Sequence, residues 1–171
     1  MDRIAAYREG LRWAFDLLEM VVEDVTAEQA HWEPPGIANP LGAVYAHAIC
    51  SVDSVINVLL KGERPMFERT WVGKTGISEP RWASEINWAR NLKVDLPAAR
   101  EYAKAVYENA EDYLDMIDEE ELDRQVDLSM RGLGFRTVSW CLTALMISHL
   151  NNMAGEISVL KGIQGSRGYP F

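Results

Sequence analysis

The chain contains four long segments in which apolar residues recur every three or four positions, as they do on one face of an α-helix. The segments span roughly residues 3–23, 40–61, 95–118 and 137–164. Charged or polar residues stand between the apolar ones, so each segment has one face to bury and one to expose. We therefore predict four amphipathic helices.

Residues typical of helix starts precede several of these segments. Asn39 and Pro40 predict the start of the second helix, because asparagine can cap free amides and proline fits the first helical position. Asp95, followed by Pro97, predicts the start of the third helix for the same reason. The Thr26–Gln29 pair has the spacing of a capping box and predicts one short extra turn after the first helix.

The segments between the helices differ in length. Residues 62–94 have poor periodicity and several prolines and glycines, which predicts a long crossover between the second and third helices. Within it, Ser78 and Pro80 could open a short helix through Trp88. Residues 124–135 predict an irregular or briefly extended link. We expect the crossover to cover an end or side of the helices with its large aromatic residues, Phe67, Trp71, Trp82 and Trp88.

Four amphipathic helices without a persuasive strand predict an all-α protein in which the apolar faces pack together as a four-helix bundle. The length of 171 residues fits a single domain, residues 1–171. Because the link between the second and third helices is long, these two neighbours can run parallel instead of in simple up-and-down order.

Charge narrows the range of partners. The formal net charge is −9, and lysine and arginine form no run that could bind a phosphate backbone. We therefore expect no nucleic-acid partner. Acidic residues crowd residues 108–123, which we interpret as a solvated helix face and not a cation site.

Cysteine and hydropathy patterns indicate the compartment. Cys50 and Cys141 lie far apart within apolar helical patterns, so we predict buried thiols and a reducing cytoplasm instead of a disulfide framework. The first residues form no apolar signal region, and no unbroken apolar run reaches about 18 residues. We therefore expect a cytoplasmic protein without a membrane partner.

The candidate chemistry centres on two histidines. His47 borders the apolar stripe of the second helix and His149 that of the fourth, and helical bundles build metal sites from such inward side chains. We predict that the two rings lie close enough to share one ligand or ion. The alternative for each histidine is simple packing in the core.

A third ligand has three candidates. Met153 and Glu156 follow His149 by four and seven residues on one helix face, and Cys50 follows His47 by three. A thioether suits copper(I) better than zinc, and Glu156 would have to lean back along the helix. Core packing for Met153 and Cys50, and a capped or solvated acid for Glu156, are the alternatives.

Motifs for other chemistries are absent from the sequence. It contains no glycine-rich nucleotide loop, no Cys-x-x-Cys pair, no His-Glu-x-x-His and no nucleophile elbow. The sequence therefore gives no support to nucleotide binding, dithiol redox chemistry or hydrolysis by an activated serine.

Two stretches resemble one known family. The sequence HWEPPGIANPLGA at residues 31–43, followed by His47, is similar to the entry into the second helix of DinB-like proteins. The sequence HLNNMAGEI at residues 149–157 resembles the family's final helix, in which His-x-x-x-His-x-Gly-Gln is common. The resemblance extends over the whole chain in the order and spacing of the helices.

The resemblance implies a bundle of up-down-down-up order, often a homodimer, with a divalent metal, zinc or nickel, held by one histidine of the second helix and two of the last. His47 and His149 match these positions, whereas Met153 stands where the third histidine is expected and Glu156 replaces the usual glutamine. The metal site is therefore altered, because an open catalytic zinc site ordinarily has three protein ligands.

The family resemblance implies a metal-dependent enzyme of the thiol-dependent S-transferase, isomerase or hydrolase type. Such an enzyme would use a low-molecular-weight thiol or water on a small-molecule substrate. The alternative is a non-catalytic small-molecule-binding or stress-response module that lost the metal when Met153 took the ligand position. A third hypothesis is a purely structural helical dimer. The metal content of the purified protein distinguishes the metal-dependent enzyme from the other two hypotheses.

Overall fold

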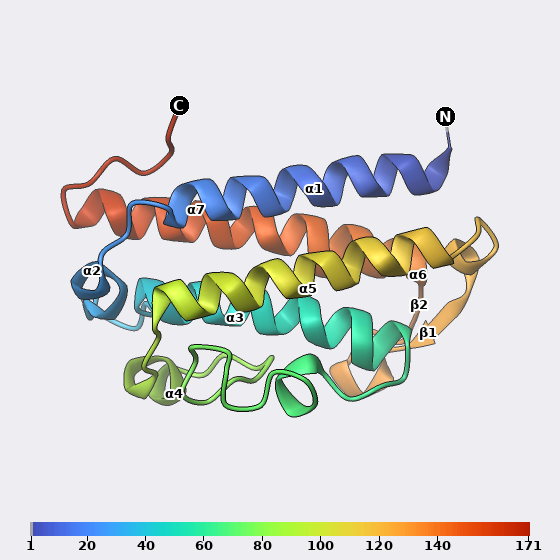
Figure 1. Ribbon diagram of the computed structural model, residues 1–171, viewed down its shortest axis with the longest axis horizontal. Helices are drawn as coiled ribbons and strands as arrows, with labels where there is room; N and C mark the ends of the chain where they lie inside the picture. The colour runs from blue at the N-terminus through green and yellow to red at the C-terminus, as the bar shows by residue number, and fades with distance from the viewer. Residues whose placement is uncertain (1) are drawn as a thin grey trace.

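The computed structural model describes residues 2–171 and is mostly helical (Figure 1). Its long α-helices are α1 (Arg3–Val22), α3 (Leu41–Asp53), α5 (Leu96–Met116) and α7 (Ser148–Ile163). Helix α1 packs against α7 and α5, and α3 also packs against both α7 and α5, so the four enclose a common core. Figure 1 shows α3 and α5 running in one direction and α1 and α7 in the opposite direction.

Two of the long helices contain π-helical segments. The segment η1 (Ser54–Leu60) continues α3, and η5 (Cys141–Ile147) joins the short α6 (Val138–Trp140) to α7. The second and last helices therefore extend as far as the sequence predicted. The wider π turns were not foreseen, because an apolar stripe at a period near 3.6 does not distinguish one local turn type from another.

The helix caps are only partly those predicted. Thr26 and Gln29 form the reciprocal capping box that starts α2 (Ala27–His31). The Asp95 carboxylate caps α5 by accepting from the amide of Ala98 at 3.3 Å. The predicted cap by Asn39 is wrong. Pro40 itself occupies the N-cap position of α3, and the Asn39 amide instead donates to the Ser84 hydroxyl at 3.2 Å.

The crossover between η1 and α5 contains two short helices, η2 (Met66–Glu68) and α4 (Ile86–Asn91). The predicted helix starting near Ser78 and Pro80 is wrong, since α4 begins only at Ile86. Ser78 is fixed instead beside an isolated bridge between Ile77 and Val94: its amide donates to the Lys93 carbonyl and its hydroxyl accepts from the Lys93 amide, both at 3.0 Å.

A buried carboxylate holds the crossover against the bundle. Asp53, at the end of α3, accepts hydrogen bonds from the Tyr102 hydroxyl of α5 at 2.5 Å and from the Asn57 amide at 2.6 Å. It also accepts from the backbone amides of Met66 and Phe67 at 2.9 and 3.2 Å. These four donors satisfy a charge that would otherwise be costly to bury.

The crossover aromatics cover the core incompletely. Phe67 and Trp88 are buried and Trp71 is half-buried against the core, as expected, but the Trp82 side chain is 47% exposed. Trp82 therefore forms part of the surface, and its backbone carbonyl lies beside Ser51 on α3.

The link between α5 and the last helix contains β1 (Gln125–Asp127) and β2 (Phe135–Thr137), flanked or separated by the short η3 (Glu121–Asp123) and η4 (Ser129–Arg131). The strands pair antiparallel, with Gln125 opposite Thr137. The prediction of a briefly extended link is confirmed, and the all-α prediction needs only the addition of this small sheet.

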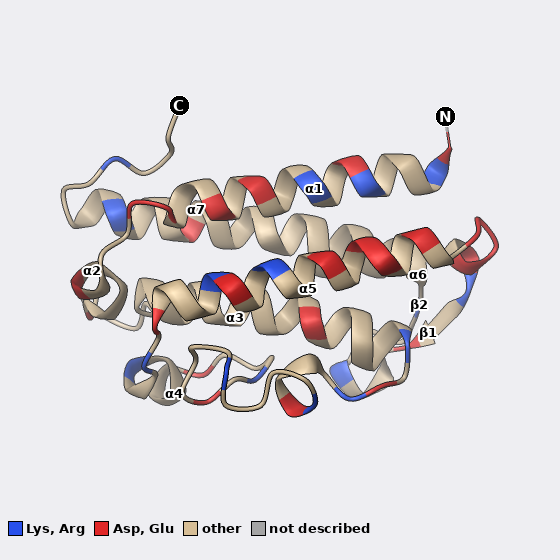
Figure 2. Ribbon diagram, viewed as in Figure 1, with Lys and Arg blue, Asp and Glu red and all other residues tan. Residues whose placement is uncertain are grey.

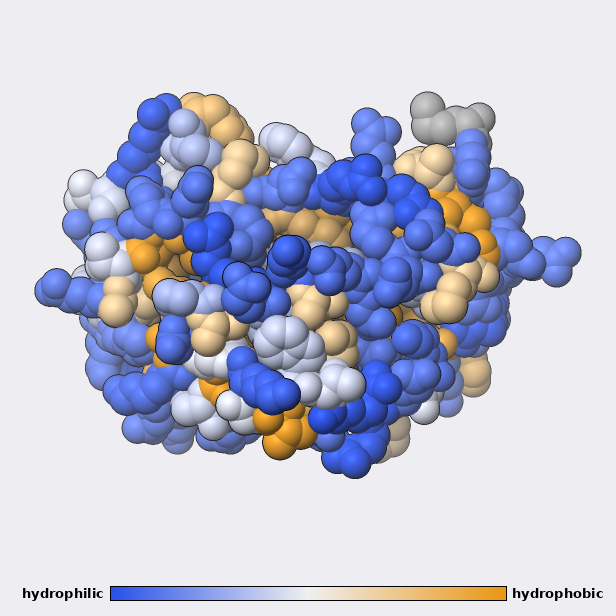
Figure 3. Space-filling view, viewed as in Figure 1, coloured by the Kyte–Doolittle hydropathy of each residue, from blue (hydrophilic) through white to orange (hydrophobic). Residues whose placement is uncertain are grey.

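The surface is mainly hydrophilic on the face in Figure 3, with hydrophobic patches between the polar residues. Acidic residues follow α5 beside basic positions of α1 (Figure 2). Arg8 pairs with Glu111 and Asp115 at 2.7 Å, so the acidic segment is partly ion-paired and not only solvated. Residues 41–60 are long and apolar enough to cross a membrane, but 78% of their most apolar window is buried, as in a core helix.

Candidate functional site

The structure brings His47 and His149 together between α3 and α7. Their ring centroids are 5.0 Å apart, and the ring planes are nearly perpendicular at 89°. His47 lies in the middle of α3, whereas His149 is the second residue of α7, directly after η5. Packing of α3 against α7 therefore positions both imidazoles.

Both rings are mostly buried, which disfavours their charged forms. Burial lowers the pKa of His47, although a hydrogen bond with the Trp82 backbone acts in the opposite direction. Burial, and then the neighbouring His47, lower the pKa of His149 to about 4. The two imidazoles are consequently neutral at pH 7, the form in which histidine binds a metal ion.

The hydrogen bonds of the two rings are unequal. The Nδ1 atom of His47 lies 3.4 Å from the Ser51 hydroxyl, which in turn lies 3.4 Å from the Trp82 carbonyl oxygen. The Nε2 atom of His149 is buried and has no hydrogen-bond partner within residues 2–171. Because buried polar atoms are nearly always paired, this nitrogen points to a ligand.

The candidates for a third ligand have different surroundings. Met153 is half-buried and packs against the hydrophobic core. Glu156 is also half-buried, and burial raises the pKa of its carboxyl group. Cys50 is fully buried, and burial raises the pKa of its thiol, which stays protonated at neutral pH. In the part of the chain that the structure describes, no group of three His, Cys, Asp or Glu side chains could hold a metal ion.

The remaining histidine has a structural role. The Nδ1 atom of His31 lies 2.8 Å from the Ala27 carbonyl oxygen, and its Nε2 atom accepts from the Val94 amide at 3.0 Å. The Nδ1 contact stays within α2 and the Nε2 contact joins α2 to the end of the crossover, so both nitrogens are used and His31 is separate from the candidate site.

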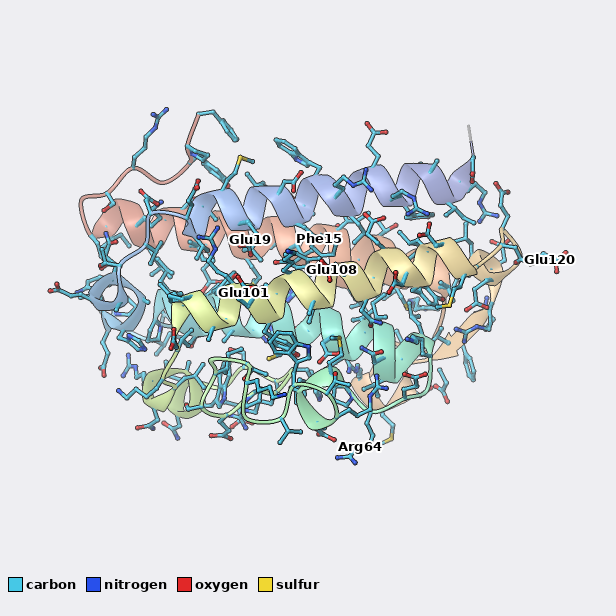
Figure 4. All side chains as sticks on the ribbon, in the orientation of Figure 1. Phe15, Glu19, Arg64, Glu101, Glu108 and Glu120 are labelled. Carbon is cyan, nitrogen blue, oxygen red and sulfur yellow. The ribbon has the colours of Figure 1, made fainter. Side chains whose placement is uncertain are left out.

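A second polar cluster lies between α1, α3 and α5. Glu19 accepts from the Tyr45 hydroxyl at 2.7 Å, from the Tyr107 hydroxyl at 3.2 Å and from Arg100 at 3.1 Å. It lines a cavity of about 560 Å³, and Figure 4 places it beside Phe15 on α1. Its partners already use the Glu19 carboxylate, so we interpret the cluster as a clamp between helices.

Sequence reasoning missed the contact between Arg131 and Trp82, whose backbone lies beside His47. The Arg131 guanidinium lies 4.1 Å from the centroid of the Trp82 ring. We expected Trp82 only to cover the core, and Arg131 lies in a link with no motif around it. No signal in a single sequence brings together two positions from separate irregular segments.

Comparisons with known proteins agree with the helical architecture. A model of the DinB superfamily matches residues 11–157. A crystal structure of a conserved protein from Enterococcus faecalis is similar over 97% of this chain and 99% of that chain, with a TM-score of 0.81 and 20% sequence identity. At this identity the likeness shows the fold alone. No curated protein matches the chain.

Proposed function

Because the chain belongs to the DinB superfamily, we propose that it is an enzyme in which His47 and His149 hold one divalent ion, zinc or nickel. When bound, the ion would lower the pKa of a coordinated low-molecular-weight thiol or water, which then attacks a small electrophile. The observation that carries the proposal is the unpartnered, buried Nε2 atom of His149 beside a second neutral imidazole.

The geometry of the pair supports this role. With metal–nitrogen distances near 2 Å and tetrahedral angles, two imidazoles on one ion have centroids about 5 Å apart. The observed separation is 5.0 Å. The Ser51 hydroxyl beside Nδ1 of His47 would orient that ring and leave Nε2 for the ion.

The rest of the coordination sphere would come from outside the histidine pair. We propose that Met153 contributes little to zinc or nickel, because a thioether is a soft, weak donor. Glu156 lies about two turns from His149 and would have to reach back along α7. A thiol or water molecule would therefore complete the site, and the protein should bind the ion less tightly than a protein with three histidines.

The absence of a complete set of three ligands in residues 2–171 favours a second candidate, a small-molecule-binding or stress-response module that has lost the metal. In that case, His47 and His149 would line a binding pocket without catalysing a reaction.

We also infer that α1, α3, α5 and α7 form a four-helix bundle of up-down-down-up order. The directions of the helices in Figure 1 support this order, as does the crossover that returns the chain from the end of η1 to the start of α5. This arrangement would place one histidine on each of two neighbouring antiparallel helices.

Calorimetric titration of zinc and nickel into protein purified without a polyhistidine tag tests the proposed function. We expect one bound ion per chain, with the binding lost in His47→Ala and His149→Ala. His31→Gln should keep it, because His31 is used in structural hydrogen bonds. A parent protein that binds neither ion would instead support the non-catalytic module.

A further inference from the structure

We propose that a cleft at Ser54, two helical turns from His47, binds the carboxylate of a small, partly apolar molecule, with Arg131 and Ser54 as its ligands. The cleft has a volume of about 330 Å³, and its lining includes Ser54, Val58, Phe67, Trp82 and Arg131. As a description of the substrate, this proposal rests on the proposed function, but binding to the cleft requires no metal.

Arg131 is the cation of the cleft that lacks an acidic partner in the described chain. Its guanidinium stacks over Trp82 at 4.1 Å, and within residues 2–171 its side chain makes no hydrogen bond or ion pair. Stacking holds the plane of the guanidinium and leaves its N–H groups directed outward from the edge of that plane. Arginine in this arrangement can donate two parallel hydrogen bonds to a carboxylate.

The acidic residues of the cleft are already neutralised by other partners. Glu63 pairs with Arg69 at 3.0 Å, and Glu68 pairs with Arg64 at 3.2 Å. Arg131 is therefore the cleft residue whose charge lacks a counterion in the described chain. An anionic ligand would supply that counterion, and a cationic one would be repelled.

Ser54 is a second and independent indication of a ligand. Ser54 lines the cleft and is only 2% exposed, yet its hydroxyl has no hydrogen-bond partner in the described part of the chain. An unpaired buried hydroxyl costs free energy that a bound oxygen atom would recover. The apolar side chains of Val58, Phe67 and Trp82 would contact the rest of the molecule.

Two connections join the cleft to the histidine pair. Ser54 follows His47 by seven residues along one continuous helix, which corresponds to two turns or about 10 Å. Trp82 connects the two sites more directly, because its ring lies in the cleft while its carbonyl oxygen contacts Ser51, the neighbour of His47. A carboxylate held at Arg131 would thus leave the other end of a small molecule near the histidine pair.

Benzoate and its uncharged analogue benzamide test the proposal on metal-free protein by NMR titration. We expect benzoate to shift the indole resonance of Trp82, identified with the variant Trp82→Phe, and to bind at least about tenfold more tightly than benzamide, since a charge-assisted pair is worth about that factor. Arg131→Gln should remove this preference, and Ser54→Ala should weaken benzoate binding.

The double variant Arg64→Gln with Glu68→Gln is the matched control. Arg64 lines the same cleft and points outward from the crossover in Figure 4, and removing it together with its partner Glu68 leaves the charge balance of the cleft unchanged, so benzoate binding should not weaken. Arg131→Lys keeps the positive charge and should retain part of the preference, which distinguishes loss of charge from loss of fold.

Equal binding of benzoate and benzamide, or an unchanged preference in Arg131→Gln, would overturn the proposal. Shifts confined to residues outside the cleft would do the same. Failure of the proposed metal site leaves these results unaffected, because the titrations contain no metal and His149→Ala should still bind benzoate.

Discussion

At the scale of single residues, Met153 provides the sharpest test of the altered site. It lies one turn after His149, and a histidine there would add a third imidazole already oriented by α7. We predict that Met153→His raises zinc or nickel affinity at least about 100-fold, because imidazole binds these ions far better than a thioether. Calorimetric titration of both proteins at neutral pH measures the difference.

Two controls isolate the contribution of the new ring. Met153→Leu preserves the apolar packing without adding a donor and should bind like the parent. Adding His149→Ala to Met153→His should abolish the gain. Equal affinities for the parent and Met153→His would show either that residue 153 does not face the ion or that another residue already completes the site.

His149 should also make stability depend on pH. Its pKa is lowered to about 4 by burial and by His47, whereas an unfolded chain has a histidine pKa near 6.5. Between these values the unfolded state binds more protons, so the free energy of unfolding falls as pH decreases. Protonation of His149 should lower the free energy of unfolding by on the order of 2–3 kcal/mol between pH 6.5 and 4, at about 1.4 kcal/mol per pKa unit.

Urea unfolding of the parent and His149→Gln across pH 7.5 to 4.5 measures this effect. The variant should lose less stability over the range, because glutamine does not titrate. Parallel pH profiles for the two proteins would contradict the prediction.

The histidine pair could be predicted at this scale because both residues border long apolar stripes, and helix periodicity fixes which face they occupy. The lack of a hydrogen-bond partner for the His149 Nε2 atom could not be predicted, because it depends on what packs around the ring in three dimensions. Arg131 and Trp82 were missed for the same reason: they meet through tertiary contacts between two irregular segments.

At the scale of elements, the crossover depends on one close approach to α5. Gly76 has a φ of 70°, and a Cβ atom there would lie 2.6 Å from the Ala99 amide nitrogen and 2.7 Å from the Asp95 carbonyl oxygen. Gly73 has nearly the same φ of 69° but open space around the Cβ position. Replacing each glycine by alanine therefore distinguishes the cost of the positive φ, which both positions share, from the cost of the close contact, which only Gly76 has.

We predict that Gly73→Ala costs about 1 kcal/mol of unfolding free energy, the usual cost of a positive φ for alanine. Gly76→Ala should cost at least about 2 kcal/mol more, because backbone atoms of α5 must move. Chemical denaturation of both variants measures the difference. Equal losses would mean that the contact with α5 relaxes freely.

The elements that sequence predicted correctly are those with local causes. Apolar periodicity determined the long helices, and the Asp95 carboxylate and the Thr26–Gln29 capping box determined two helix starts. The failures involve partners distant in sequence. Asn39 binds Ser84 instead of capping α3, and Ser78 pairs with Lys93 instead of starting a helix.

At the scale of the whole molecule, the exposed apolar residues of α7 support the prediction of a homodimer. Val159 and Ile163 are 63% and 58% exposed, and their spacing of four residues places them on one face of the helix. Exposed apolar neighbours are costly in water, and an interface between two copies of the chain would bury them twice through its twofold symmetry.

We predict that sedimentation velocity at micromolar concentration shows a dimer. The double variant Val159→Lys with Ile163→Lys should associate at least about tenfold more weakly, because each copy would bury two uncompensated charges in the interface. The matched control is Ile37→Lys with Val72→Lys. These residues are also exposed but lie outside α7, so the control adds the same charge and should leave the dimer intact. If both double variants dissociate equally, net charge and not the α7 face governs association, and a monomeric parent would contradict the homodimer itself.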